Sequence, residues 1–552
     1  MPQDIYDKIL TLAKRRGYIY PSFEIYGGVA GFYDYGPLGS QLKNNIENLW
    51  RKYYLFVDGC VEISTPTITL FEVLQASGHV DEFTDLTVDC PTCKRSYKVA
   101  DILQDGCRVE DAVKKNMLIC PGCKKKLTDP HPVNLMFSTS IGVGDSRKAF
   151  LRPETAQGIF TNFHLLYRYH REKLPFGVVQ VGRGYRNEIS PRQGTLRQRE
   201  FSMAEAEIFF DPLCKKHPRF DLVKEKKIKL FDNEKEYMLS LQDAVQKKII
   251  HNQSLAYYMY LTQEFLVDVG VDINRFRFRK HAADELAHYA TECWDAELFS
   301  ERFGWVECVG IADRSAYDLN AHIVASSVDM YAVRKFDQPQ ERLVKKIVPK
   351  MNVLGPLFKD KAAAVKQALE ALDVETSKKV QIVLDGKKID IPDHCFDVVE
   401  VQERVVGEKF IPHVIEPSYG IDRIVYFVLE HSYREVTKND EDYRILQLRP
   451  HIAPIKVGVF PLTTDETLVM LAQQVECSLR QQGISTFYDE AGTIGRRYAR
   501  MDEIGTPLCV TIDHESLSHN TVTVRDRDTT KQERVAIENL VAFLNSKIGC
   551  SQ

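Results

Sequence analysis

The sequence lacks any stretch that would target the chain or anchor it in a membrane. No run of about 18 apolar residues is present, and residues 1–7 do not join a basic start to an apolar segment. Internal repeats and low-complexity segments are also missing. We therefore expect a cytoplasmic protein with no membrane partner.

A strong charge of one sign is missing as well. The 552 residues include 73 Lys and Arg against 77 Asp and Glu, which leaves a formal net charge of -4. The chain as a whole does not attract a polyanion, so any nucleic-acid surface must be a local basic patch. The length predicts three or four domains at about 100–200 residues each. Hydrophobic residues make up 44 %, which is typical of a globular protein.

The cysteines do not form a disulfide pattern. There are thirteen, an odd number, and four of them stand in the close pairs Cys90-Pro-Thr-Cys93 and Cys120-Pro-Gly-Cys123. Each C-x2-C turn presents two thiolates, and two such turns supply the four soft ligands of a closed tetrahedral zinc site. We predict a structural Zn²⁺ within an insertion, with Cys107 as a rival ligand. The alternative is two chance pairs of reduced thiols.

Apolar periodicity and glycine-rich turns indicate a mixed fold. Helical spacing runs over 40–56, and a short strand ended by proline follows at 61–66. Glycine turns separate short strands from 137 to 210, which predicts an antiparallel sheet. Residues 215–280 hold little glycine or proline and predict mainly helices. After residue 449, strands alternate with helices and predict a compact α/β domain.

The densest group of charged residues brackets a loop that contains a proline and a glycine. Arg186, Asn187 and Glu188 precede the loop; Arg197, Gln198, Arg199, Glu200 and Phe201 follow it. In a hairpin, Arg186 and Glu188 share one face. A guanidinium can bind a phosphate in bidentate fashion, and Phe201 could stack on a purine. Taken alone, such a run is more often a solvated charged hairpin.

Three motifs favour the functional interpretation. Arg186-Asn-Glu188 with Arg199-Glu-Phe201 resembles motif 2 of the class II aminoacyl-tRNA synthetases. Residues 61–66 resemble motif 1, with Pro66 as its proline, and Gly420-Ile-Asp-Arg423-Ile resembles motif 3. The three occur in the order that the class requires, and together they are specific. The resemblance implies an α+β core with an antiparallel sheet flanked by helices.

Shorter motifs resemble one family of that class, the dimeric-type glycyl-tRNA synthetases. The C-terminal segment resembles the anticodon-binding domain shared with the histidyl, prolyl and threonyl enzymes. Such enzymes form glycyl-adenylate from glycine and ATP, and then transfer glycine to the 3′ end of tRNA(Gly) for protein biosynthesis. The motifs are Phe32-Tyr-Asp-Tyr-Gly-Pro-Leu-Gly39, Ala76-Ser-Gly-His79, Leu151-Arg-Pro-Glu-Thr-Ala-Gln-Gly158, Phe201-Ser-Met-Ala-Glu205, Ala312-Asp-Arg314 and Glu416-Pro-Ser418.

The resemblance implies the following organisation, and it is weakest over the two later insertions. The expected parts are the catalytic core with motifs 1 and 2 (1–87 and 131–214), a zinc-binding insertion (88–130), a helical insertion (215–280), the second part of the core with motif 3 (281–330 and 410–448), a second insertion (331–409) and an anticodon-binding domain (449–552).

The resemblance also implies site residues. Arg186 and Arg423 are expected to be catalytic, at the α- and γ-phosphates of ATP, while Glu307 holds the Mg²⁺ that accompanies ATP. Phe201 is the expected adenine stacker, and the motif 1 helix implies a homodimer. The implied ATP-binding set is Arg186, Asn187, Glu188, Arg197, Gln198, Phe201, Glu307, Cys308 and Arg423; the implied glycine-binding set is Glu154, Glu205, Glu416, Ser418 and Arg314; the implied metal ligands are Cys90, Cys93, Cys120 and Cys123.

One departure and several alternatives accompany the resemblance. The chain reads Lys98-Val99-Ala100-Asp101 where many relatives carry Arg-Ala-Asp. A synthetase of the same subclass with another amino-acid specificity would lack the four pocket residues Glu154, Glu205, Glu416 and Ser418. A synthetase-like accessory protein that binds nucleic acid without catalysis would have lost the ATP arginines. A zinc-ribbon nucleic-acid binder with incidental similarity would not carry the long intact core.

Overall fold

The computed structural model describes residues 4–103, 117–144, 146–191, 193–232, 234–282, 290–370, 380–384, 387–438 and 441–549. The chain divides into two compact units. The first comprises Met1–Met330 and Pro412–Gln552, and the second comprises Tyr331–Ile411. Cys107 and Arg192 lie outside the described residues.

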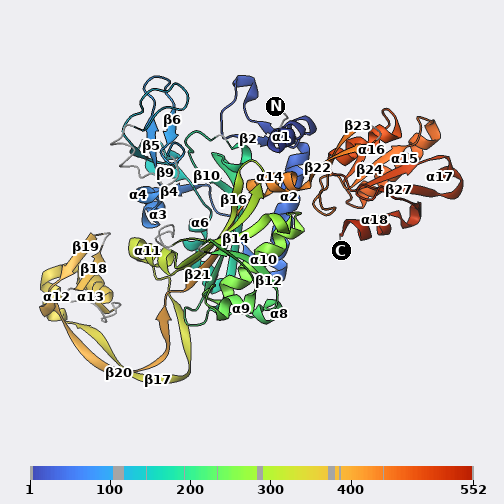
Figure 1. Cartoon of the computed structure of the whole chain (residues 1–552). Coiled ribbons are helices and arrows are strands. Elements are labelled where there is room, and N and C mark those ends of the chain that lie inside the picture. The colour runs from blue at the N-terminus through green and yellow to red at the C-terminus, as the bar shows by residue number, and fades with distance from the viewer. Residues whose placement is uncertain are drawn as a thin grey trace. The chain divides into compact units, whose positions relative to one another are not determined.

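A nine-stranded sheet organises the described residues of the first unit (Figure 1). Neighbouring strands pair antiparallel, apart from the parallel pairs β10–β3 and β12–β14. The predicted antiparallel core is therefore confirmed. In sheet order the strands are β13 (Lys235–Ser240), β12 (Lys227–Asp232), β14 (Phe276–Lys280), β15 (Glu292–Ser300), β16 (Gly304–Ser315), β21 (His413–Gly420), β11 (Glu200–Phe210), β10 (Phe176–Tyr185) and β3 (Val61–Glu62).

One face of the central strands packs against three helices. These are α2 (Pro37–Arg51), α10 (Gln253–Asp268) and α14 (Ile421–Ser432), whose apolar side chains share one core. Tyr419 of β21 points into this core, where its hydroxyl lies 2.9 Å from the Tyr54 hydroxyl and 2.7 Å from Thr262 Oγ1. Because side chains alternate along a strand, Ser418 points to the opposite face of the sheet.

Helix α2 follows the predicted range with small shifts at both ends. It begins at Pro37, since proline is tolerated in a first turn, and it continues into a wider π-helical segment, Lys52–Asp58. Its stripe of Leu42, Ile46 and Trp50 is fully buried in this chain's own core. The stripe alone therefore does not indicate a subunit interface.

The segment 215–280 differs from its predicted helical character. It holds helices α8 (Phe220–Val223), α9 (Leu241–Gln246) and α10, but strands β12, β13 and β14 join the main sheet. Strand β12 buries Ile228 and Leu230, while lysines alternate with them. The connecting turn places Glu234 at φ 62°, a left-handed value that favours glycine, although the residue there is glutamate. Low glycine content therefore misled the helical prediction.

The C-terminal α/β fold expected after residue 449 is confirmed. Its five-stranded sheet has the order β25 (Thr486–Tyr488), β24 (Val457–Pro461), β26 (Leu508–Ile512), β27 (Thr521–Asp526) and β28 (Gln532–Ala536). Helices α15 (Glu466–Gln481), α16 (Ile494–Glu503), α17 (His514–His519) and α18 (Leu540–Ile548) accompany it. Strand β28 pairs with β27, and the last helix begins after it, at Leu540. Tyr18 links the core to this domain by donating to the Ile504 carbonyl at 2.8 Å.

The second unit falls in the expected second insertion. Two long strands, β17 (Ala332–Pro349) and β20 (Phe396–Phe410), form an antiparallel ribbon, and a smaller hairpin joins β18 (Val380–Leu384) to β19 (Lys387–Ile391). Helices α12 (Met351–Phe358) and α13 (Ala362–Glu370) share a small apolar core with the hairpin.

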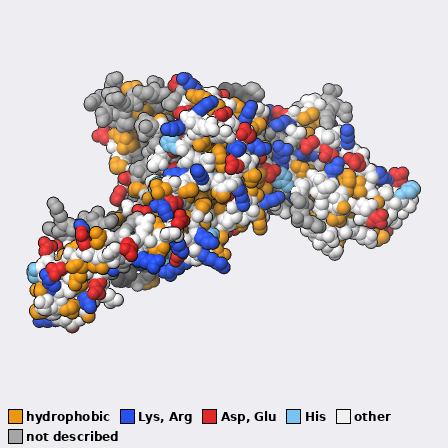
Figure 2. Space-filling model, turned by 90° about the horizontal axis from the view of Figure 1, so that it is seen from below, with side chains coloured by type: hydrophobic (Ala, Val, Ile, Leu, Met, Phe, Trp, Pro, Cys, Tyr) orange, Lys and Arg blue, Asp and Glu red, His pale blue; other side chains and the backbone are white. Residues whose placement is uncertain are grey.

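Charges of both signs are spread over the surface. On the face shown in Figure 2, Lys and Arg side chains are mixed with Asp and Glu side chains. In the part of the chain that the structure describes, no helix has the length and apolar character needed to cross a membrane.

Candidate active site

Two neighbouring cavities open on the face of the sheet opposite the helical core. The first, of about 120 Å³, is lined by motif 2 residues together with the end of β21 and the start of α14. The second, of about 200 Å³, is lined mainly by carboxylates and strands β15, β16 and β21. Arg186, Glu307 and Ser418 line both cavities, so the two spaces meet at these residues.

The first cavity presents cations and an aromatic ring. The Arg186 guanidinium lies 5.3 Å from the centroid of the Phe201 ring and 5.3 Å from that of Phe83. Phe201 pairs with Gly184 of β10, where a Cβ would lie only 2.8 Å from the ring. Glycine at this position therefore leaves room for the ring. At the start of α14, Arg423 Nη1 donates to the Glu307 carbonyl at 2.6 Å.

Only some of the remaining motif 2 residues line the first cavity. Glu188, Arg197 and Gln198 line the first cavity, as do Glu307, Cys308 and Arg423. Asn187 is exposed, and it is not among the residues that line this cavity. Arg199 holds loops together, because it donates to the Ala30 carbonyl at 2.7 Å and the Glu188 carbonyl at 2.9 Å.

Three glutamates meet in the second cavity. Glu205 accepts from the Thr155 amide at 2.6 Å and from Ser418 Oγ at 2.8 Å. Burial raises the pKa of Glu205, and the charge of Glu154 adds to the rise. Burial also opposes ionisation of Glu154, but His79 Nε2, 3.3 Å away, and Gln157 hold the pKa of Glu154 below its ordinary value.

A buried arginine holds the third glutamate. Arg314 pairs with Glu416 and binds both oxygens of Asp318 at 2.8 and 2.9 Å. Burial raises the pKa of Glu416 to about 8, with Arg314 opposing the rise and Glu205 and Glu154 adding to it. Arg314 is not among the residues that line the second cavity. Its guanidinium holds the Asp318 and Glu416 carboxylates from outside the cavity lining.

The second cavity is therefore an acidic pocket whose lining includes one arginine, Arg186. Several carboxylates converging on a small space favour an ammonium group through charge-assisted hydrogen bonds. Arg186 also lines the cation-rich cavity. Its guanidinium can therefore contact an anion bound in the first cavity and an anion bound in the second. The arrangement suits a small amino acid placed beside a phosphorylated nucleotide.

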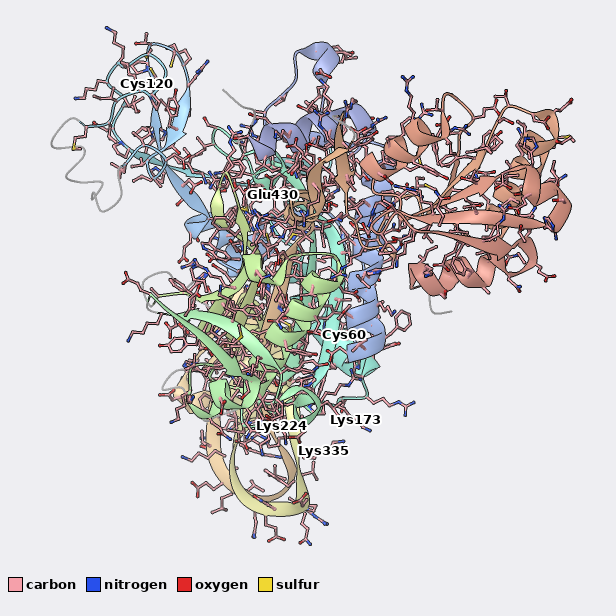
Figure 3. All side chains as sticks on the ribbon, turned by 45° about the vertical axis from the view of Figure 1, so that its right-hand side comes forward. Cys60, Cys120, Lys173, Lys224, Lys335 and Glu430 are labelled. Carbon is pink, nitrogen blue, oxygen red and sulfur yellow. The ribbon has the colours of Figure 1, made fainter. Side chains whose placement is uncertain are left out.

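The four cysteines of the insertion bring their sulfur atoms together in a separate small lobe, in which Figure 3 labels Cys120. Cys90 Sγ lies 3.4 Å from Cys123 Sγ, and Cys93 Sγ lies 3.5 Å from Cys120 Sγ. The two turns have matching geometry. Cys90 N donates to the Arg95 carbonyl and Cys120 N to the Lys125 carbonyl, each at 2.8 Å. Lys94 and Lys124 then take left-handed φ values of 56° and 59°.

This donor set fits zinc. A tetrahedral ion with Zn–S bonds of about 2.3 Å needs sulfur atoms roughly 3.8 Å apart, close to the spacing of the two pairs. Hydrogen bonding from Tyr97 lowers the pKa of Cys120 to about 6, whereas, against the Lys125 amide, hydrogen bonding with Cys90 raises the pKa of Cys123 to about 11, so the four thiols hold their protons unequally. The strands β5 (Thr84–Asp89), β6 (Ser96–Lys98) and β7 (His131–Asn134) form the sheet of this lobe.

A second group of potential ligands lies in the wall of the acidic pocket. Among the described residues, His281, Cys293 and Asp295 also bring their ligand atoms within 4.8 Å of one another. Asp295 is already bound by His281 Nε2 at 2.8 Å and by Arg279 at 2.9 Å. Burial raises the pKa of Cys293, which disfavours a thiolate. This group fits a hydrogen-bonded wall better than a metal centre.

Several residues that contact the site were not singled out from the sequence. Thr155 and His79 contact the pocket glutamates, and Asp318 holds Arg314. Thr155 and His79 stand inside two of the motifs quoted above. The sequence therefore marked their positions but did not indicate which glutamates they contact. Nothing in the local sequence indicated that Cys293 and Asp295 line the pocket.

The fold is that of a class II aminoacyl-tRNA synthetase. Residues 143–432 match the family described as "tRNA synthetase class II core domain (G, H, P, S and T)", and residues 456–547 match "Anticodon binding domain". A solved Giardia lamblia prolyl-tRNA synthetase in complex with prolyl-adenylate superposes with a TM-score of 0.54 at 13 % identity, covering 99 % of this chain and 79 % of that one. That likeness supports the fold.

Curated relatives narrow the class to one family. Glycine–tRNA ligase of Methanocaldococcus jannaschii is 46 % identical, covering 99 % of this chain and 100 % of the relative. The ligase of Methanothrix thermoacetophila is 46 % identical over 98 % and 96 % of the two chains. That of Archaeoglobus fulgidus is 47 % identical over 97 % and 96 %. The chain belongs to the glycine–tRNA ligase family.

Proposed function

We propose that the protein activates glycine with ATP and transfers it to tRNA(Gly). The observation that carries the proposal is that Arg186, Glu307 and Ser418 belong to both the cation-rich and the acidic cavity. Activation joins a carboxylate to a phosphate, so the two substrates must meet at one point. Family membership supports the amino acid, the nucleotide and the tRNA.

In this proposal the first cavity binds ATP with its Mg²⁺. Arg186 binds the α-phosphate, Arg423 binds the γ-phosphate and Phe201 stacks on adenine. Arg186 and Arg423 line this cavity from motif 2 and from the first turn of α14. Glu307 is half exposed and faces both cavities, which suits a carboxylate that shares a magnesium ion with substrate phosphates. Glu188, Arg197, Gln198 and Cys308 complete the wall, and Asn187 stays a weaker candidate.

The second cavity holds glycine in this proposal. Glu154, Glu205 and Glu416 surround the ammonium, and Ser418 contacts the substrate from β21. A residue without a side chain must be recognised by its charges and by exclusion of larger groups. Arg314 acts as the support of Glu416, since Asp318 and Glu416 already accept from its N–H groups. Arg186 is better placed than Arg314 to meet the glycine carboxylate.

The chemistry needs positioning and neutralisation of charge. A carboxylate oxygen of glycine attacks the α-phosphorus, the bond to the bridging oxygen breaks, and pyrophosphate leaves. The terminal ribose hydroxyl of tRNA then attacks the carbonyl carbon of glycyl-adenylate, and AMP leaves. Placing the reactants in line and meeting developing charge with preorganised cations provide the acceleration. No protein nucleophile takes part.

Four further properties belong to the proposal. Cys90, Cys93, Cys120 and Cys123 hold one structural zinc, and the C-terminal domain reads the anticodon. The protein works in the cytoplasm. It forms a homodimer, which we base on the resemblance to the dimeric type, since the stripe of α2 is buried in its own core. Light scattering at micromolar concentration that gives a monomer mass would count against the dimer.

Exchange of pyrophosphate into ATP, measured with each of the twenty amino acids, tests the proposal. We expect exchange with glycine alone. Stronger exchange with alanine, serine or threonine would refute the specificity, and no exchange at all would favour a non-catalytic accessory protein. Charging of tRNA(Gly) with a substituted anticodon should fall while exchange is unchanged; equal charging would refute anticodon reading.

A further inference from the structure

The lobe that carries the four cysteines touches the motif 2 loop at three points. Lys98 Nζ lies 3.2 Å from Glu188 Oε2, and Ser190 Oγ donates to the Ser96 carbonyl at 2.5 Å. Arg197 Nη1 lies 3.8 Å from Asp101 Oδ2. Two of these loop residues, Glu188 and Arg197, line the first cavity. The lobe therefore contacts the wall of the cavity from behind.

Lys98 is the central cation of these contacts. It also pairs with Asp85 of β5, so one ammonium stands between two carboxylates. The side chains of Lys98 and Glu188 are only 13 % and 12 % exposed. In such a poorly solvated place, a carboxylate that loses its partner is costly: without Lys98, Asp85 would lose this cation and Glu188 would keep only the more distant Arg197.

The position of Lys98 depends on the first cysteine turn. Lys98 of β6 pairs with Thr87 of β5, and Ser96 pairs with Asp89. The link between these strands is the turn that carries Cys90 and Cys93, and its geometry sets the register of the pair. A bound zinc would hold this turn closed, and the strands would carry that order to Lys98.

We propose that Lys98 is a positioning residue of the ATP site, which orients the Glu188 carboxylate in the cavity wall and thereby keeps Arg197 in place. Arg197 Nε lies 3.8 Å from the same Glu188 Oε2 that Lys98 contacts. Lys98 is not among the residues lining either cavity, so it acts through Glu188. The inference rests on the proposed binding of ATP in the first cavity.

Steady-state exchange kinetics test this role. For Lys98→Met we expect the KM for ATP to rise about tenfold, because a charge-assisted contact is lost in the nucleotide site, while the KM for glycine and kcat change less than about twofold. Lys98→Arg should restore most of the ATP affinity. Lys126→Met, at an exposed lysine of the same lobe, should behave like the unmodified protein.

A double-mutant cycle with Glu188→Gln separates positioning from general damage. If Lys98 acts through Glu188, the effect of Lys98→Met on the KM for ATP should shrink to below about twofold in the Glu188→Gln background. Zinc content and the thermal midpoint should stay unchanged in Lys98→Met. If Lys98→Met alters zinc content or stability, Asp85→Asn replaces it in the same cycle.

The inference is overturned if Lys98→Met keeps a normal KM for ATP, or if its effect is the same with and without the Glu188 carboxylate. A rise in the KM for glycine equal to that for ATP would also overturn it. Failure of the proposed function looks different, because then the unmodified protein and Lys126→Met would show no glycine-dependent exchange.

Discussion

Glycine binding should release a proton from the acidic pocket. Burial raises the pKa of Glu416 to about 8, while Arg314 opposes the rise and Glu205 and Glu154 add to it. Near pH 7 this carboxyl is therefore mostly neutral when the pocket holds no cation. An ammonium placed against it favours the ionised form, so binding and deprotonation are coupled.

The direction and the magnitude of the pH dependence of glycine binding follow from that pKa. A group with a raised pKa must lose its proton to bind a cation, so affinity rises with pH until the pKa is passed. With a pKa of about 8, the ionised fraction is about 1 % at about pH 6, about 9 % at about pH 7 and about half at about pH 8. The KM for glycine should therefore fall roughly 50-fold between about pH 6 and about pH 8, and then level off.

Calorimetric titration of glycine in two buffers of different ionisation enthalpy measures the proton release directly. We expect close to one proton per site near pH 7. Glu416→Gln, which stays neutral, should bind glycine weakly, with much less proton release and a much flatter pH dependence than the unmodified protein. No proton release by the unmodified protein, together with a KM for glycine that is flat from about pH 6 to about pH 8, would refute the reasoning. The other titratable or charged groups in or beside this pocket are His79, Glu154, Arg186, Glu205, Glu207, His281, Cys293, Asp295, Glu307, Arg314 and Asp318.

Three further predictions follow from the site and the core. Arg186→Ala and Arg423→Ala should each lower kcat for exchange about a hundredfold at saturating substrates, since each removes a preorganised cation. Elemental analysis should find one zinc per chain, and Cys120→Ser should lose it. Gly39→Ala should lower the free energy of unfolding by about 1–3 kcal/mol, and with it the thermal midpoint, because the added Cβ would lie 1.8 Å from the Tyr18 carbonyl oxygen.

Matched controls keep these predictions sharp. Arg183→Ala, in β10 three positions before Arg186 and outside the lining of both cavities, should leave exchange nearly unchanged. Cys477→Ser, at an exposed thiol, should retain zinc. Gly495→Ala, in helix α16 with open space around the new Cβ, should not destabilise the protein. Near-normal exchange by Arg186→Ala would show that the motif 2 assignment is wrong.

The sequence was informative where the residues of one site lie close together in the chain. The two cysteine turns came directly from spacing, and their four sulfur atoms do converge. Arg186, Glu188 and Phe201 were expected to share a site, and all three line one cavity. The order of the three class motifs predicted the antiparallel core, because each motif is a local strand, hairpin or strand–helix unit whose residues lie within a few positions of one another.

Other features were decided by pairing between distant segments. Lysine-rich stretches of 227–240 became an edge hairpin only because β12 pairs with β14. The role of Arg314 depends on Asp318 and on Glu416, a hundred residues away, which engage its guanidinium before any substrate can.

The sequence by itself thus determined the class of the fold, the chemistry of its motifs and the residue types of the two substrate sites. Only the tertiary structure decided which charges neutralise one another, which of them face a cavity, and that Lys98 stands behind Glu188. The physical reason is that burial and Coulomb interaction act through space: a charged side chain takes its role from whichever partner the sheet register and the packing bring within a few ångströms.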